Sequence, residues 1–186
     1  MLDLLLNADR SLFLLLNVQW SNGFLDGMMP IVTDLSYWFA LLVPLYAYLW
    51  FGGQGKHRAL ALLLLLAVGT TDQISSSVIK KQVGRKRPCC ALEQSRKLLG
   101  CKTSKSFPSS HAANTAAVAG VILFEKGLAI GIPFLVISGI VSYSRIYVGV
   151  HYPLDVTMGM ILGLFIGFLW VQLWHRFRKK PELSVR

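Results

Sequence analysis

The segment SRIYVGVHYPLD, residues 144–155, lies between two long apolar stretches and determines how the rest of the chain is interpreted. His151 and Asp155 are four residues apart, so a helix that begins near Pro153 brings the carboxylate within reach of one imidazole nitrogen. Such a hydrogen bond fixes the tautomer and leaves the other nitrogen as a nucleophile or base. Arg145 ends the preceding apolar stretch and is predicted to contact a bound anion such as phosphate.

A histidine and an aspartate at this spacing are usually structural when they occur alone, so the other charged clusters matter. Lys80 and Arg87 are seven residues apart, two helical turns, and face the same way if the helix continues past the membrane. Pro88 biases Arg87 away from helical geometry and marks a boundary. Two cations on one face suit a dianionic phosphate, with the arginine able to bind it in a bidentate way. The alternative is a pair of long side chains that snorkel to lipid headgroups.

The third cluster is FPSSH, residues 107–111, which precedes an apolar, alanine-rich helix. The N-terminus of a helix presents unpaired N–H groups and a partial positive charge, and therefore attracts anions. Ser109 and Ser110 can cap the helix and offer hydroxyls and amides to phosphate oxygens. His111 is predicted to lie in the first turn, beside the same anion. The alternative is an ordinary serine cap with an interfacial histidine.

The composition is that of a membrane protein. The chain has 186 residues, of which 54% are hydrophobic and 15% are charged, whereas a soluble domain carries about 25% charged residues. The apolar residues occur in long runs, which predicts an all-α bundle of transmembrane helices. No linker or repeat divides residues 1–186, so we expect a single domain with its catalytic motifs within 80–155. The five predicted spans are 28–51, 59–79, 110–125, 128–147 and 154–174, of which the alanine-rich 110–125 suits a helix buried among the others.

The N-terminal segment, residues 2–20, is apolar but carries polar residues at helical spacing. We expect these to project from one face of an amphipathic helix that lies in the membrane interface. A tilted sixth span is the alternative, and the three charges within the segment count against it. A cleavable signal peptide fits less well, because Asp3 and Asp9 stand where positive residues are expected. The polar residues assigned to the face are Asp3, Asn7, Arg10 and Asn17.

Charge predicts the orientation in the membrane. The net charge is +10, from 19 Lys and Arg against 9 Asp and Glu, and no fold that binds nucleic acid is evident. Because positive residues stay in the cytoplasm, we place the basic tail after Trp174 there, together with 56–58 and 125–126. The loop 80–109 and the turn 148–153 then lie outside. All three clusters are therefore predicted on the same, external face.

Together the clusters resemble the three-part signature of the type 2 phosphatidic acid phosphatase superfamily, which includes vanadium haloperoxidases and glucose-6-phosphatase. Its motifs are KxxxxxxRP, PSGH and SRxxxxxHxxxD, and they match residues 80–155 here, within spans that fit the membrane branch of the family. One departure is Ser110, which stands where the motif has glycine. Serine is small and keeps its amide, so we expect activity to survive with slightly altered oxyanion contacts.

The resemblance implies catalytic roles. His151 becomes the nucleophile that forms a phosphohistidine, Asp155 orients it, and His111 protonates the leaving oxygen. The residues implied to hold the phosphate are Lys80, Arg87, Ser109, Ser110 and Arg145. No carboxylate cluster suited to a divalent ion occurs near the motifs, so we expect no metal and no cofactor.

The resemblance also implies an envelope-lipid substrate in the bacterial inner membrane, cleaved at the periplasmic side. Lipid A 1-phosphate, undecaprenyl diphosphate and phosphatidylglycerophosphate are the expected substrate classes, between which the sequence does not choose. Transfer of the phosphate to another lipid alcohol is one alternative. A transporter in which Asp72 lines the pathway is another, although it leaves both histidines unused. The sequence does not define the oligomeric state.

Other polar residues have simpler interpretations. Asp72 shares a helical stripe with Ser76 and Lys80 and is predicted to make a buried structural hydrogen bond. Asp34 could act similarly in the first span. The cysteines all fall in the external loop, where Cys101 could pair with Cys89 or Cys90, or all three could stay free. A metal site there lacks a fourth ligand.

Overall fold

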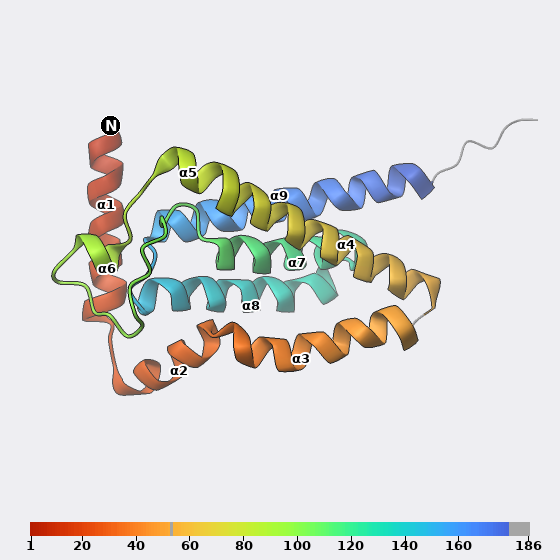
Figure 1. Cartoon of the computed structure of the whole chain (residues 1–186), viewed down its shortest axis with the longest axis horizontal. Helices are drawn as coiled ribbons and strands as arrows, with labels where there is room; N and C mark the ends of the chain where they lie inside the picture. Colours follow the sequence, from red (N-terminus) through yellow and green to blue (C-terminus); the bar gives the residue numbers. More distant parts are fainter. Residues whose placement is uncertain (53, 179–186) are drawn as a thin grey trace, which may run out of the picture.

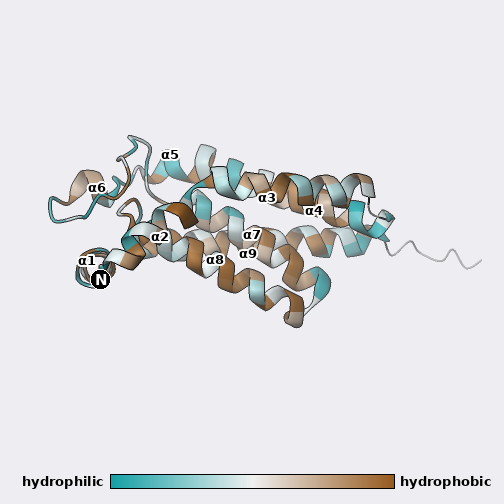
Figure 2. Cartoon of the chain, turned by 90° about the horizontal axis from the view of Figure 1, so that it is seen from below, coloured by the Kyte–Doolittle hydropathy of each residue, from teal (hydrophilic) through white to brown (hydrophobic). Residues whose placement is uncertain are grey.

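The computed structural model describes residues 1–52 and 54–178, and in these residues every regular element is helical. Most helices run side by side as an elongated bundle, and α1 crosses one end of it (Figure 1). Four helical stretches are long and apolar enough to cross a membrane: Leu35–Gly52, Gly55–Ala91, Leu128–Tyr147 and Pro153–Arg178. Hydrophobic residues run along α3 and α8, and hydrophilic ones gather at the two ends of the bundle (Figure 2). The expected all-α membrane bundle is confirmed.

The helices follow one another through short turns, except for the long loop between α6 and α7. Three π-helical segments extend neighbouring α-helices: η1 (Leu15–Gln19), η2 (Tyr48–Gly52) and η3 (Gln73–Ile79). The α-helices are α1 (Leu2–Leu14), α2 (Gly23–Thr33), α3 (Leu35–Ala47), α4 (Gly55–Asp72), α5 (Lys80–Val83), α6 (Pro88–Ala91), α7 (Ser110–Lys126), α8 (Leu128–Tyr147) and α9 (Pro153–Arg178).

The helix α7 lies at the centre of the bundle and packs against α4, α8 and α9. It has 17 residues, slightly fewer than the roughly 20 that a bilayer requires. The side chains on its inward faces are small, and the alanines at 112, 113, 116, 117 and 119 are fully buried. Small residues let helix backbones approach closely in a membrane. The expectation of a buried, alanine-rich helix is confirmed.

Three glycines of α9 make the contact with α7 unusually close. Gly159, Gly163 and Gly167 recur every four residues and face the backbone of α7. A Cβ added at Gly163 would lie 2.0 Å from the carbonyl oxygen of Ala113. This contact aligns the first turns of the two helices, where the Ser109 N–H donates to the Asp155 carbonyl at 2.9 Å.

The first predicted span, 28–51, is wrong as a single helix. It is broken at Asp34, whose backbone is extended and whose carboxylate accepts a hydrogen bond from the Ser36 amide at 2.9 Å, which caps α3. The indole N–H of Trp38 donates to the carbonyl of Val32 at 2.7 Å and satisfies part of the end of α2. These two bonds satisfy backbone N–H and C=O groups that the break leaves without partners at the ends of α2 and α3. The break turns Thr33 and Asp34 toward the rest of the molecule.

The N-terminal helix α1 lies across the end of the bundle, as a helix in the membrane interface would (Figure 1). Asp9, Phe13 and Asn17 recur every four residues and are buried against the bundle. The assignment of Asn17 to the outer polar face is therefore wrong: its amide donates to the Tyr147 carbonyl at 2.6 Å. Asp3, Asn7 and Arg10 are exposed, as expected.

Lys80 and Arg87 do not share a helix. The helix that begins at Gly55 ends at Val83, because Gly84 adopts a left-handed conformation with φ of 64° and caps it. Arg87 is extended, with φ of −69° and ψ of 148°, as its position before Pro88 predicts. The two cations therefore approach the site from separate elements.

The three motif clusters lie at the same end of the bundle (Figure 1). The opposite end holds the α3–α4 and α7–α8 connections and the end of α9, where His175 and Glu125 pair at 2.8 Å. This separation agrees with the predicted topology. The side of the membrane on which each end lies is still a prediction.

The cysteines converge in the loop at the motif end. Cys101 lies within disulfide range of both Cys89 and Cys90, with Cα–Cα distances of 5.8 and 6.5 Å. One sulfur forms only one disulfide, so one of the three cysteines remains a thiol. Either pairing fastens the segment around Cys101 to α6.

The close α7–α9 contact predicts that Gly163→Ala destabilises the protein. The new Cβ has to displace the Ala113 carbonyl, and overpacking of this kind costs about 1–3 kcal/mol. Gly139→Ala in α8 is the matched control, because nothing lies within 4 Å of its added Cβ. Thermal denaturation in detergent should show a lower midpoint than wild type for Gly163→Ala and an unchanged midpoint for Gly139→Ala. Equal midpoints for the two variants would contradict the close contact.

Candidate functional site

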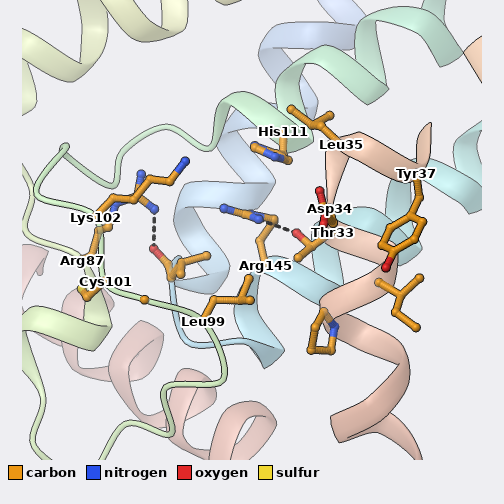
Figure 3. Close-up of a pocket in the computed structure, with 14 residues that line it drawn as sticks. Thr33, Asp34, Leu35, Tyr37, Arg87, Leu99, Cys101, Lys102, His111 and Arg145 are labelled. Carbon is orange, nitrogen blue, oxygen red and sulfur yellow. Dashed lines mark hydrogen bonds between the residues drawn. The ribbon is translucent and has the colours of Figure 1, made fainter. Parts of the chain in front are cut away.

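A cavity of about 720 Å³ opens at the motif end of the bundle. Three of its lining residues come from the three sequence clusters: Arg87, His111 and Arg145 (Figure 3). The α2–α3 break contributes Thr33 and Asp34, and the loop before α7 contributes Lys102. Cations, a histidine and apolar side chains from Ile31, Leu35 and Tyr37 therefore share one cavity.

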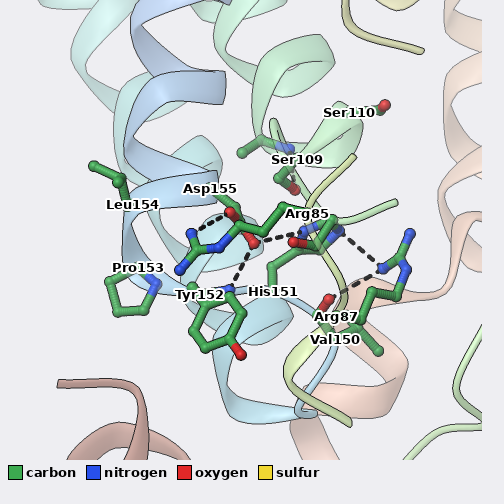
Figure 4. Close-up of polar contacts among 12 residues, drawn as sticks. Arg85, Arg87, Ser109, Ser110, Val150, His151, Tyr152, Pro153, Leu154 and Asp155 are labelled. Atoms are coloured by element: carbon green, nitrogen blue, oxygen red, sulfur yellow. Dashed lines mark hydrogen bonds and ion pairs between the residues drawn. The ribbon is translucent and has the colours of Figure 1, made fainter. Parts of the chain in front are cut away.

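His151 is not among the residues that line this cavity and is 1% exposed. Its Nε2 is 3.2 Å from Nη1 of Arg87 (Figure 4). A guanidinium only donates hydrogen bonds, so Nε2 is the unprotonated nitrogen and Nδ1 carries the proton. Nδ1 lies 3.6 Å from Oδ2 of Asp155, which is longer than a hydrogen bond, and within the described residues this nitrogen has no hydrogen-bond partner. The spacing of four thus brings the imidazole and the carboxylate close together, but the predicted hydrogen bond between them is not formed in this structure.

Burial keeps His151 uncharged. Removal from water lowers the pKa of His151 to about 4, although the Asp155 carboxylate opposes this by favouring the protonated ring. Arg145 and Arg87 also disfavour a second positive charge nearby. At neutral pH the imidazole is therefore neutral, with a lone pair on Nε2.

Two arginines border the cavity with neutral partners only. Arg87 donates to the backbone carbonyls of Ser104 at 2.8 Å and Val150 at 3.1 Å. Arg145 donates to the hydroxyl of Thr33. The Nε of Arg145 is buried, and within the described part of the chain it has no hydrogen-bond partner. An anion in the cavity could satisfy that donor.

Lys80 reaches the site through Ser110. The ammonium of Lys80 donates to the Ser110 hydroxyl at 2.6 Å. The hydroxyls of Ser75 and Ser76 also lie 3.1 and 3.0 Å from that of Ser110. Ser109 is fully buried, and its hydroxyl caps α7 by accepting from the Ala112 amide. Because the Ser109 N–H already donates to Asp155, Ser109 supports the helix start and does not offer its amide to the cavity.

The sequence reading missed two residues of the site, Arg85 and Asp9. Arg85 donates to Oδ1 of Asp155 at 2.7 Å and to Oδ2 of Asp9 at 2.6 Å (Figure 4). Its guanidinium lies 3.9 Å from the centre of the Tyr152 ring. Arg85 stands inside the first motif but outside its specified positions, and nothing local in the sequence pairs it with a carboxylate 76 residues earlier.

The remaining acidic residues are structural. Asp72 accepts from Asn114 at 3.1 Å and from Ser76 at 3.4 Å, so the predicted hydrogen bonding is present, although Asp72 is half-buried and not buried. Asp34 caps α3 at the rim of the cavity. Among residues 1–52 and 54–178, the cysteine cluster is the one group of His, Cys, Asp or Glu side chains with the spacing of metal ligands.

Comparisons with known proteins identify the family of the chain. The sequence model of the PAP2 superfamily matches residues 58–179. The chain is 32% identical to a lipid A 4'-phosphatase of Bacteroides thetaiotaomicron over 98% of this chain and 84% of that protein. It is 27% identical to an undecaprenyl-diphosphatase of Bacillus subtilis, over 89% of this chain and 83% of the other.

The fold is shared with a solved structure as well. The crystal structure of a transmembrane PAP2-type phosphatidylglycerolphosphate phosphatase from Bacillus subtilis superposes with a TM-score of 0.75 and 29% identity. The match covers 96% of this chain and 89% of the other. The chain therefore belongs to the PAP2 superfamily, as an integral-membrane lipid phosphatase.

Proposed function

We propose that the protein hydrolyses a membrane lipid phosphate or diphosphate at the external leaflet, without a metal, through a phosphohistidine on His151. The observation that carries this proposal is the meeting of the three motif clusters at one end of the bundle. There Nε2 of His151 faces Arg87, and the adjoining cavity is bordered by Arg87, His111 and Arg145.

The charges favour binding of a phosphate. Lys80, Arg87 and Arg145 supply three cations, and the free Nε of Arg145 supplies an unused donor. Phosphoryl transfer depends mainly on positioning and on neutralising the charge of the transferred group. Cations supplied by the chain take the part that Mg²⁺ takes in other phosphatases. Arg87 must shift from Nε2 of His151 as the phosphate enters, and it then binds the phosphate oxygens.

The two histidines divide the chemistry. Nε2 of His151 attacks phosphorus, the bond to the lipid oxygen breaks, and His111 gives that oxygen a proton. The proton on Nδ1 stays there, facing Asp155, which stabilises the charge of the ring. Water then attacks the phosphohistidine while His111 accepts a proton, and the P–N bond breaks to release inorganic phosphate. Ser109 and Ser110 hold the start of α7, and with it His111, against the phosphate.

The lipid class follows from the surroundings of the cavity. Ile31, Leu35 and Tyr37 place apolar surface next to the cations, and none of the residues of α3 is buried, so this helix faces lipid. Relatives that resemble the chain act on lipid A and undecaprenyl diphosphate. We therefore propose an envelope lipid with a terminal phosphate or diphosphate. The basic far end of the bundle favours the cytoplasm, which places the site on the periplasmic side of a bacterial inner membrane.

The first test is phosphate release. Purified protein in detergent with EDTA should release inorganic phosphate from at least one of phosphatidic acid, phosphatidylglycerophosphate, undecaprenyl diphosphate and lipid A. His151→Ala should lower the rate about 10³-fold or more, because the nucleophile is lost. His175→Ala, at the far end of the bundle, is the matched control and should keep full activity. Equal activity in the two variants would rule out the proposed nucleophile.

The second test is isolation of the intermediate. With a substrate labelled at the transferred phosphorus, a rapid quench should leave label on the protein. That label should be stable in alkali and lost in acid, as a phosphoramidate is. It should be absent from His151→Ala and present in His175→Ala. Direct attack by water would leave no labelled protein in either variant while phosphate is still released.

The burial of His151 predicts its titration. By NMR of the histidine-labelled protein, the pKa of His151 should lie well below the usual 6.5, near the value of about 4 that burial imposes. Asp155→Asn should lower the pKa further, because the carboxylate favours the protonated ring. His57, half-buried at the far end of α4, gives an internal reference signal. A pKa that rises in Asp155→Asn would contradict the contact between the two side chains.

A further inference from the structure

The carboxylate of Asp155 is held on both of its oxygens. Oδ1 accepts from Arg85 at 2.7 Å, and Oδ2 accepts from the Tyr152 amide at 2.9 Å. Oδ2 is also the oxygen that faces Nδ1 of His151. A terminal carboxylate torsion is broad when nothing holds it. Arg85 therefore sets the plane in which Asp155 meets the imidazole.

Arg85 is in turn fixed by the N-terminal helix. Its second nitrogen donates to Oδ2 of Asp9 at 2.6 Å, and its planar group covers the Tyr152 ring. The guanidinium is a rigid fork, so fixing one carboxylate helps to fix the other. The other oxygen of Asp9 accepts from the Leu154 amide at 2.7 Å, in the first turn of α9. Asp9 thus binds both Arg85 and the helix that carries Asp155.

Arg85 differs from the three cations proposed to bind the phosphate. Arg87, Arg145 and Lys80 have neutral hydrogen-bond partners, whereas Arg85 bridges two carboxylates whose side chains are 4% and 0% exposed. The side-chain hydrogen bonds of Arg85 go to Asp155 and Asp9, and among the described residues none goes to His151. It therefore acts on the reaction only through Asp155.

We propose that Arg85 is a positioning residue that orients Asp155 toward His151, and that Asp9 of α1 holds Arg85 in place. The proposal rests on the phosphohistidine function given above. It makes the docking of α1 a condition for turnover and not only for membrane attachment. The chain of contacts runs from Asp9 through Arg85 and Asp155 to the nucleophile.

The test measures kcat and KM separately for each variant, with the lipid that the wild-type protein hydrolyses fastest as the substrate. Arg85→Gln should lower kcat about 100-fold, as a small misplacement of a catalytic group does. KM should stay within about threefold, because the phosphate-binding cations are intact. Arg85→Lys should recover part of the loss, since it restores the charge but not the fork. Asp9→Asn should lower kcat by only about tenfold, because Arg85 loses its bond to Asp9 but keeps its bond to Asp155.

Arg96→Gln is the matched control. Arg96 pairs with Asp26 at 2.5 Å at the same end of the protein and also contacts the backbone of Asn17 in η1, but it does not touch Asp155. It should keep kcat within about threefold of wild type. If Arg96→Gln loses as much activity as Arg85→Gln, Arg85 is merely structural and the proposal fails.

A double-mutant comparison distinguishes an effect on catalysis from a loss of folding. Arg85→Gln should add little to the effect of Asp155→Asn, because both changes act on the same step. Effects that multiply would overturn the proposal, as would an Arg85→Gln protein with wild-type kcat. If Arg85→Gln does not give monodisperse protein, Arg85→Lys and Asp9→Asn are compared in the same cycle with the same criteria. A wild-type protein without phosphatase activity would instead refute the proposed function.

Discussion

The contact between the first turns of α7 and α9 is the constraint on which the site depends. α7 carries Ser109 and His111, whereas α9 carries Asp155 and follows directly after His151. The Ser109 amide bonds to the Asp155 carbonyl, and the glycines of α9 let the two backbones approach to van der Waals contact along their length. A side chain at Gly163 would push these helices apart and separate the two histidines. The proposed catalytic geometry is therefore a consequence of helix packing.

The partners of each cation separate charges that are paired with a carboxylate of the protein from charges that are not. Arg85 and Arg96 bind carboxylates directly, and such pairs compensate charge near the protein interior. Arg87 and Arg145 bind carbonyls and a hydroxyl, which hold the side chain but leave its positive charge uncompensated. In the proposed function, a dianionic phosphate supplies the missing negative charge. The same residue types thus perform different tasks because of what surrounds them.

The arrangement of the three clusters was predicted better from the sequence than the bounds of the individual helices were. The spacing from His151 to Asp155, the helix start at Ser110 and the common end of the three clusters all follow from short-range rules of helix geometry and charge. The break at Asp34 was missed because its compensation comes from Trp38 and Ser36, whose role is visible only once the backbone is bent. Arg85 was missed because its partner, Asp9, is distant in the sequence. Long-range pairings of this kind leave no local pattern.

Ser110 shows how one departure from the family motif fits into the rest of the site. A glycine at this position would offer no hydroxyl to Lys80, whereas Ser110 accepts from its ammonium and lies beside the hydroxyls of Ser75 and Ser76. Ser76 in turn contacts Asp72, so a chain of hydrogen bonds leads from a half-buried carboxylate to the lysine. The carboxylate is held away from the ammonium by two hydroxyls, which orient Lys80 without forming an ion pair with it. An ion pair would compete with phosphate for Lys80, and the hydroxyls avoid that competition.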